Sequence, residues 1–207
     1  MASKDRRARH KQLVRQEILD AARDILVKEG CDRLTMRAVA ERIEYSPTAI
    51  YLHFKDKQEL VFAVCEETFS RLVRELEETQ KEFKDPLVRL KKGLRRYVDF
   101  GLRHPQHYLA TFVIPHPEES PEAAAKHHGP QTMGMQALGI LHGTLDACIR
   151  AGKLRRVNVD VAARALWAAL HGVTSLMIVD PLFPWGDRDG VIDLLIDSAV
   201  DGLRPKR

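Results

Sequence analysis

Aromatic residues are scarce in this chain. They make up only 6% of its 207 residues, so the core has to be built mainly from Leu, Val, Ile and Ala, a set that suits helices. The three cysteines, Cys31, Cys65 and Cys148, are far apart and include no Cys-x-x-Cys pair. This spacing argues against a disulfide framework and fits a reducing compartment. Redox sensing is the less favoured alternative, because no electropositive setting around these thiols is apparent.

Long apolar segments and β-patterns are lacking as well. No opening apolar stretch resembles a signal peptide, and we find no apolar run long enough to span a bilayer. We also find no sheet signal and no internal repeat. These absences predict a soluble, cytoplasmic, all-α protein without a membrane partner.

Signatures of catalysis and metal binding are missing too. No paired carboxylates, nucleophile constellation or phosphate-binding glycine loop stands out. His104 and His107 are three residues apart, but Pro105 breaks the helix that would place them on one face. A zinc site needs three or four ligands in a defined geometry, and the remaining candidates are His116, His127, His128 and His142. We expect no enzyme, no metal and no cofactor.

Positive charge is concentrated at the N-terminus, although the net charge is only +4. The first sixteen residues carry six basic side chains against one acidic side chain, Asp5. Such a block can be a solvated tail or a contact for phosphate groups. The block alone does not decide between the two. We interpret residues 1–11 as a flexible basic arm, and Arg6, Arg7 and Arg9 are its candidates for phosphate contact.

Several stretches show the apolar spacing of amphipathic helices. Gly30, the Asp85-Pro86 pair and Pro105 mark boundaries, since glycine ends helices and proline starts or interrupts them. Residues 115–130 hold four prolines and three histidines, which predicts a loop with one short helix, Glu122–His127. The expected long helices are 12–29, 57–80, one that opens at Asp85-Pro86 and is ended by His104-Pro105, 131–151, 159–180 and 187–203.

Residues 35–57 predict two short helices around a polar break. Thr35 is a good N-cap for the first helix. Ser46 and Pro47 restart a helix, because serine caps and proline is tolerated at the first helical position. Polar, aromatic and basic side chains gather at the end of the second helix, namely Tyr51, His53, Lys55 and Lys57. A stable core does not need this cluster, whereas a surface that binds phosphate does. The stretch therefore predicts a helix-turn-helix whose second helix lies on nucleic acid.

The run SPTAIYLHFKDKQEL at 46–60 resembles the signature of the TetR family of bacterial transcriptional regulators. Together with the helix ending at Gly30 and the run LTMRAVAERI at 34–43, the resemblance covers about residues 12–60. One departure is Glu44, where the family usually has glycine. If the turn needs a positive φ, this residue costs on the order of 1 kcal/mol, and it brings a negative charge near the DNA side.

The resemblance implies a DNA-binding domain at 12–57 and a helical regulatory and dimerisation domain at 58–207. It implies phosphate contacts from the basic arm and from Thr35, Tyr51, His53 and Lys57. Base contacts are expected from Arg37, Pro47, Thr48, Ala49 and Leu52, because arginine pairs well with guanine and small apolar groups touch thymine methyls. Ser46 and Lys55 complete the predicted DNA-binding set.

The resemblance also implies a homodimer on a palindromic operator, with the recognition helices about one DNA turn apart. Trp167, His171 and Gly172 resemble a Trp–His–Gly type of C-terminal domain in the family. Because 159–180 is apolar almost all round, it must be buried on every side, which a subunit interface can provide. The expected interface residues are Trp167, Val173, Leu176, Val191, Leu194, Leu195 and Ser198.

In the family, a small-molecule effector releases a repressor from DNA, and movement along the helix at 57–80 transmits its binding. A plain connecting helix fits the same residues. The candidate effector-pocket residues are Tyr97, Phe100, Tyr108, Phe112, Met133, Leu138 and His171. The expected function is a repressor released by an effector; an activator, or an architectural DNA binder without an effector, is the alternative.

Overall fold

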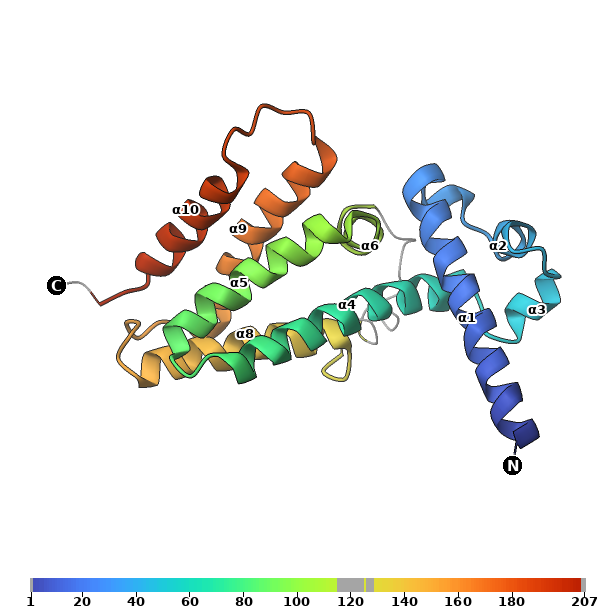
Figure 1. The fold of residues 1–207 in the computed structure, drawn as a ribbon, viewed down its shortest axis with the longest axis horizontal. Helices are drawn as coiled ribbons and strands as arrows, with labels where there is room; N and C mark the ends of the chain where they lie inside the picture. The colour runs from blue at the N-terminus through green and yellow to red at the C-terminus, as the bar shows by residue number, and fades with distance from the viewer. Residues whose placement is uncertain (1, 115–124, 126–128, 206–207) are drawn as a thin grey trace. The chain divides into compact units, whose positions relative to one another are not determined.

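The computed structural model describes residues 2–114, 125 and 129–205, and these form helices and connecting segments with no strand (Figure 1). The expected all-α fold is confirmed. The chain divides into two compact units. The N-terminal unit comprises Met1–Thr68 and Gln106–His127, and the C-terminal unit comprises Phe69–Pro105 and His128–Arg207. The short helix expected at Glu122–His127 and the histidines His116, His127 and His128 lie outside the described residues, apart from Ala125 within that helix.

The first helix, α1 (Ala2–Glu29), is longer than expected. We expected a flexible arm at 1–11, whereas the structure continues the helix through this basic segment. No proline or glycine interrupts residues 2–29, so nothing in the backbone requires the helix to begin at residue 12. The helix ends as expected at Gly30, whose φ of +86° suits glycine.

The N-terminal unit continues with η1 (Cys31–Arg33), α2 (Met36–Arg42), α3 (Pro47–Tyr51) and the first part of α4 (Lys57–Glu82). It also takes in most of α6 (Pro105–Tyr108) and a π-helical turn, η2 (Leu109–Val113). Buried apolar side chains from α1, α2, α3, α4 and η2 and from the segment after α3 form one core, including Ile18, Leu26, Val39, Ile50, Phe54, Leu60 and Ala110. The domain boundary that we placed after residue 57 therefore falls inside α4, and the compact unit extends to Thr68.

The C-terminal unit holds the rest of α4, then α5 (Pro86–Arg103), α8 (Met133–Arg150), α9 (Val159–Val179) and α10 (Arg188–Asp201). These helices lie close to the expected ranges. Polar caps fix their starts: Asp85 accepts hydrogen bonds from the backbone N–H of Leu87 at 2.8 Å and of Val88 at 3.3 Å. Asn158 and Asp187 cap α9 and α10 in the same way, at 3.1 Å and 2.9 Å.

Helix α9 is long and apolar enough to cross a membrane by length and composition alone, which corrects our expectation that no run has this property. It packs against α5, α8 and α10 and is a core helix of its unit. Its buried side includes Leu166, Leu170 and Met177, whereas Trp167 and Leu176 on other faces are 42% and 57% exposed. The chain itself therefore covers only some faces of α9, although the helix is apolar on almost every face.

Candidate nucleic-acid interface

The short helices α2 and α3 are fixed by caps at their N-termini. Thr35 Oγ1 accepts a hydrogen bond from the Ala38 N–H at 3.0 Å, and Ser46 Oγ accepts one from the Ala49 N–H at 3.3 Å. Pro47 occupies the start of α3, where its missing N–H costs nothing. Both expected caps are confirmed. They hold the two helices in a defined geometry although each is too short to be stable alone.

The turn between α2 and α3 contains Glu44 in a left-handed conformation, with φ +59°. The turn therefore does need a positive φ at this position, the condition under which we expected a cost for a residue other than glycine. The turn is closed by the Tyr45 N–H, which donates to the Ala40 carbonyl at 2.9 Å. A residue with a Cβ is strained in this conformation, by roughly 1–2 kcal/mol.

Replacing Glu44 by glycine should raise the free energy of unfolding by about 0.5–1 kcal/mol. The relief of left-handed strain, roughly 1–2 kcal/mol, is partly offset by the greater freedom of glycine in the unfolded chain, about 0.4–1 kcal/mol. Urea denaturation measures the change. Glu44→Gln is the matched control, because it removes the charge and keeps the strain. Equal stability of the glycine and glutamine variants would contradict the prediction.

One face of α2 and α3 is exposed. Tyr51 and Leu52 are 54% and 75% exposed, and the Arg37 side chain is 82% exposed. Large apolar and aromatic side chains left in solvent on so short a helix are typical of a contact surface. The structure places several predicted DNA-binding residues on exposed positions of this segment, namely Thr35, Arg37, Ser46, Pro47, Thr48, Tyr51, Leu52 and Lys55. Ala49 and His53 are half-buried.

Basic side chains of α1 lie beside the segment that follows α3. The Arg15 guanidinium stands 4.9 Å from the centroid of the Phe54 ring, a cation–π distance. Burial, together with the positive charges of Lys11 and Arg15, lowers the pKa of His53. A lowered pKa favours the neutral form of His53, whose ring N–H can still donate a hydrogen bond to a phosphate. The predicted phosphate contacts Arg6, Arg7 and Arg9 are exposed on α1.

Two other basic residues, Lys57 and Arg42, form contacts inside the N-terminal unit. We expected Lys57 to contact phosphate, but its ammonium donates to the Cys31 carbonyl at 2.6 Å and the side chain is half-buried. This bond satisfies a carbonyl in η1. Arg42 pairs with both Asp24 and Glu29 of α1. Each of these side chains gains a partner inside the unit, which the sequence pattern does not indicate because the partners lie on another helix.

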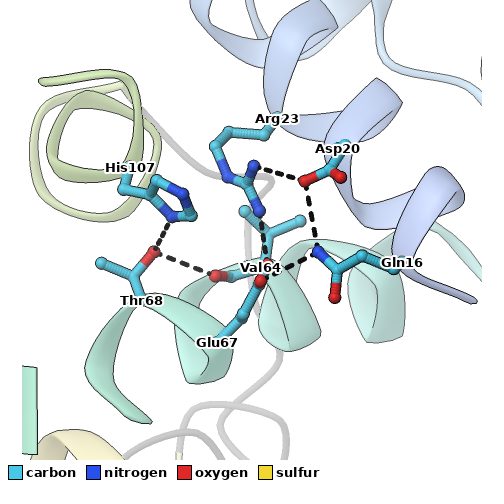
Figure 2. Close-up of polar contacts among 7 residues, drawn as sticks. All are labelled: Gln16, Asp20, Arg23, Val64, Glu67, Thr68 and His107. Atoms are coloured by element: carbon cyan, nitrogen blue, oxygen red, sulfur yellow. Dashed lines mark hydrogen bonds and ion pairs between the residues drawn. The ribbon is translucent and has the colours of Figure 1, made fainter. Parts of the chain in front are cut away.

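A polar network that sequence reasoning missed joins α1 to α4 inside the N-terminal unit (Figure 2). Arg23 is only 6% exposed. Its Nη1 donates to Asp20 Oδ1 at 2.7 Å, and its Nη2 donates to Glu67. Gln16 Nε2 donates to Glu67 Oε1 at 2.9 Å. The carboxylate of Glu67 thus receives donors from two turns of α1.

A second set of polar contacts, which begins at the next residue of α4, reaches α6. Thr68 Oγ1 donates to the Val64 carbonyl at 3.2 Å and lies 3.3 Å from His107 Nδ1 (Figure 2). Both side chains are buried. We considered His107 with His104 as a metal pair, but His104 ends α5 in the other unit, where its ring is tilted against the Phe100 ring with 5.1 Å between the centroids. No cluster of three or more metal-binding side chains occurs within the described residues.

The cysteines include one thiol, Cys148, that is buried. Burial, which is the largest effect, raises the pKa of the Cys148 thiol to about 11. A thiol with this pKa is almost entirely protonated at pH 7 and is a poor nucleophile. Cys31 and Cys65 are half-buried, and no disulfide joins the three cysteines.

The predicted effector-pocket residues fall in both units. Tyr108 and Phe112 belong to the N-terminal unit, where their rings lie 4.8 Å apart. The others belong to the C-terminal unit, with Tyr97 and Phe100 buried and the remainder half-buried, namely Met133, Leu138 and His171. Their shared role in binding an effector stays a prediction.

The predicted dimer residues are exposed with one clear exception. Val173 is 8% exposed and lies in the core of its own unit, so it is not available to a partner. Spacing on an almost wholly apolar helix does not reveal which face its own chain covers. Leu195 is half-buried, and the others are exposed: Trp167, Leu176, Val191, Leu194 and Ser198.

Comparison with known proteins agrees with this arrangement. Residues 18–64 match the family profile described as "Bacterial regulatory proteins, tetR family". Residues 90–201 match the profile described as "Tetracyclin repressor-like, C-terminal domain". The Trp–His–Gly subtype that we expected from Trp167, His171 and Gly172 is not the description of that match and stays a prediction.

Individual relatives are similar over most or part of the chain. The HTH-type transcriptional activator FasR of Mycolicibacterium smegmatis is 25% identical over 91% of this chain and 78% of its own. An HTH-type transcriptional repressor of Mycobacterium tuberculosis is 40% identical over 28% of this chain and 31% of its own. The structure of the Bacillus subtilis regulator FadR in complex with stearoyl-CoA superposes with a TM-score of 0.78 at 17% identity, covering 91% of this chain and 99% of that one.

The exposed helix-turn-helix and the helical C-terminal unit thus coincide with two adjacent family profiles that together cover most of the chain. The relatives include both an activator and a repressor. The protein belongs to the tetR family of bacterial regulatory proteins and is a DNA-binding transcriptional regulator, not an enzyme.

Proposed function

We propose that the protein is a cytoplasmic, homodimeric repressor that binds a palindromic operator and is released from it by a small-molecule effector. The observation that carries the DNA-binding part is the exposed face of α2 and α3, on which Arg37, Thr48 and Leu52 stand in solvent above a fixed core. The arginine offers hydrogen bonds to guanine, and the threonine methyl offers an apolar contact to thymine. The phosphate contacts come from Tyr51, His53, Lys55 and the basic residues of α1.

The homodimer is supported by the apolar surface that α9 and α10 leave uncovered. Leu176 on α9 is 57% exposed, and Val191 and Leu194 on α10 are 37% and 70% exposed. Exposed apolar side chains gathered on adjacent helices are typical of a subunit interface. A two-fold symmetric dimer would present two reading heads to two half-sites about 34–36 Å apart, one turn of DNA.

The effector is proposed to bind in the C-terminal unit. An effector can release DNA only if it binds better to the form whose heads are wrongly spaced for the operator. Acyl-CoA thioesters are the first class to screen, because the FadR structure of the same fold holds stearoyl-CoA. A second candidate function is activation, which the activator FasR favours among the relatives.

The proposed function is tested by selecting bound DNA from a random pool with the full-length protein. We expect an inverted repeat, with release from it on addition of an effector. Thr48→Glu should then weaken binding to the selected operator by about 10- to 100-fold, because a carboxylate replaces a base contact, and a lost contact costs roughly 1–3 kcal/mol.

Gln136→Glu is the matched control in the same binding assay. It adds the same charge at an exposed position of α8, in the other unit. Helical content measured by circular dichroism should be unchanged in both variants. If Thr48→Glu binds the operator as tightly as the wild type, α3 is not the reading helix. A selection that returns single, unrepeated sites would refute the dimeric arrangement.

A further inference from the structure

Arg37 and Glu41 lie one turn apart on α2 and are bonded to each other. Arg37 Nε donates to Glu41 Oε1 at 2.9 Å, and the two side chains are 82% and 65% exposed. An ion pair this exposed, four residues apart on a helix, adds little to stability. The stability of the fold therefore does not explain this ion pair. The pair lies on the face of α2 and α3 that we propose reads DNA.

The contrast with Arg42 on the same helix is instructive. Arg42 reaches back to α1 and pairs with two carboxylates, those of Asp24 and Glu29. Its guanidinium is committed to the packing of the unit. Arg37, among the residues that the structure describes, is held by the single carboxylate of Glu41.

A guanidinium has five N–H donors in a rigid fork. When Nε is bonded to a carboxylate, the two terminal Nη groups remain available. These two groups form the end of the fork that fits O6 and N7 of guanine. A carboxylate on Nε also restricts the rotamers of a long side chain, so less freedom is lost when the base is bound.

We propose that Glu41 is a positioning residue for specificity: it holds Arg37 by Nε, so that the terminal fork is set to read a guanine in each half-site. This inference rests on the proposed function of α2 and α3 in base readout. Glu41 itself touches no base in this arrangement. Its contribution is to the selectivity of Arg37.

The charge of Glu41 makes the inference testable. A carboxylate close to phosphate groups weakens binding to any DNA sequence. Removing Glu41 should therefore raise affinity for unrelated DNA and, at the same time, lower the preference for guanine. A role in electrostatics alone would raise affinity and leave the preference unchanged.

The experiment compares wild type, Glu41→Ala, Glu41→Gln and Arg37→Ala, each as the full-length protein. Affinity is measured for the selected operator, for operators with each guanine replaced, and for unrelated DNA, at one fixed salt concentration. In the wild type, replacing the guanine read by Arg37 should cost about 5- to 150-fold per half-site. Arg37→Ala identifies that guanine as the one whose replacement no longer matters.

We expect Glu41→Ala to reduce this guanine preference by about threefold or more, on the scale of side-chain ordering, and to bind unrelated DNA several-fold more tightly. Glu41→Gln keeps an oxygen that accepts from Nε, so it should bind unrelated DNA more tightly and retain most of the preference. Glu44→Gln removes an exposed carboxylate at the neighbouring turn and should leave the preference intact. In the Arg37→Ala background, Glu41→Ala should have no further effect on base preference.

Two results would overturn the inference. If Glu41→Ala keeps the full guanine preference while Arg37→Ala loses it, Arg37 reads the base without help from Glu41. If wild type selects no preferred sequence, the proposed function fails and this inference fails with it. Thermal unfolding of each variant confirms that the exposed substitutions leave the fold intact.

Discussion

Replacing Glu67 by alanine should lower the free energy of unfolding by about 3 kcal/mol. Arg23 and Glu67 are a mostly buried pair, with side chains 8% and 15% exposed. Removing one partner of such a pair leaves the other charge without compensation in a poorly solvated site, which costs roughly 3–5 kcal/mol. Asp20 still pairs with Arg23 at 2.7 Å, so we place the loss at the lower end. Urea denaturation followed by circular dichroism measures it.

The matched control is the double substitution Arg23→Met with Glu67→Leu. It replaces both charges by apolar side chains of similar length, an exchange that is often neutral or even stabilising. The double variant should therefore be closer in stability to the wild type than Glu67→Ala is. If Glu67→Ala unfolds within about 0.5 kcal/mol of the wild type, the range of an ordinary surface substitution, the network does not hold α1 to α4.

This network also marks the limit of what the sequence could predict. Glu67 is 44 residues from Arg23, and Thr68 is 39 residues from His107. Helical periodicity places each side chain on a face of its own helix, but it does not say which helix lies opposite. The best local signal was Arg23 itself, which stands among the buried apolar residues Ala21, Ala22, Ile25 and Leu26.

The local features were predictable because their causes are local. The caps Thr35, Ser46 and Asp85 accept hydrogen bonds from N–H groups two or three residues away. The starts of these helices could therefore be predicted from the sequence. The residue that usually occupies this turn, glycine, singled out Glu44 as the position to inspect, and the structure gives it a positive φ. By contrast, whether Val173 faces its own core or a partner depends on how α9 packs, and Lys57 found its carbonyl partner on η1. These outcomes are set by tertiary packing.

Replacing Leu194 by arginine should abolish the proposed dimer and weaken binding to the selected operator by about 100- to 10,000-fold. Leu194 is 70% exposed on α10, so the longer charged side chain does not disturb its own unit. In a dimer it would bury a charge without a partner, which is strongly unfavourable. A single head then loses the gain from two linked half-sites, a factor on the order of 10²–10⁴. Light scattering gives the mass, and an operator-binding assay gives the affinity.

Leu194 tests the interface more cleanly than Trp167 does. Trp167 Nε1 donates to the Tyr97 hydroxyl at 3.2 Å, so its replacement also removes a bond inside the unit. Val88→Arg is the matched control, because Val88 is 43% exposed on α5 of the same unit and lies outside α9 and α10. The control should stay dimeric and bind the operator like the wild type. If the Leu194→Arg variant is still a dimer, the two-fold contact lies elsewhere. If the wild type is a monomer at micromolar concentration, there is no such contact. In either case, two DNA-binding heads joined through α9 and α10 would not explain tight binding to an inverted repeat.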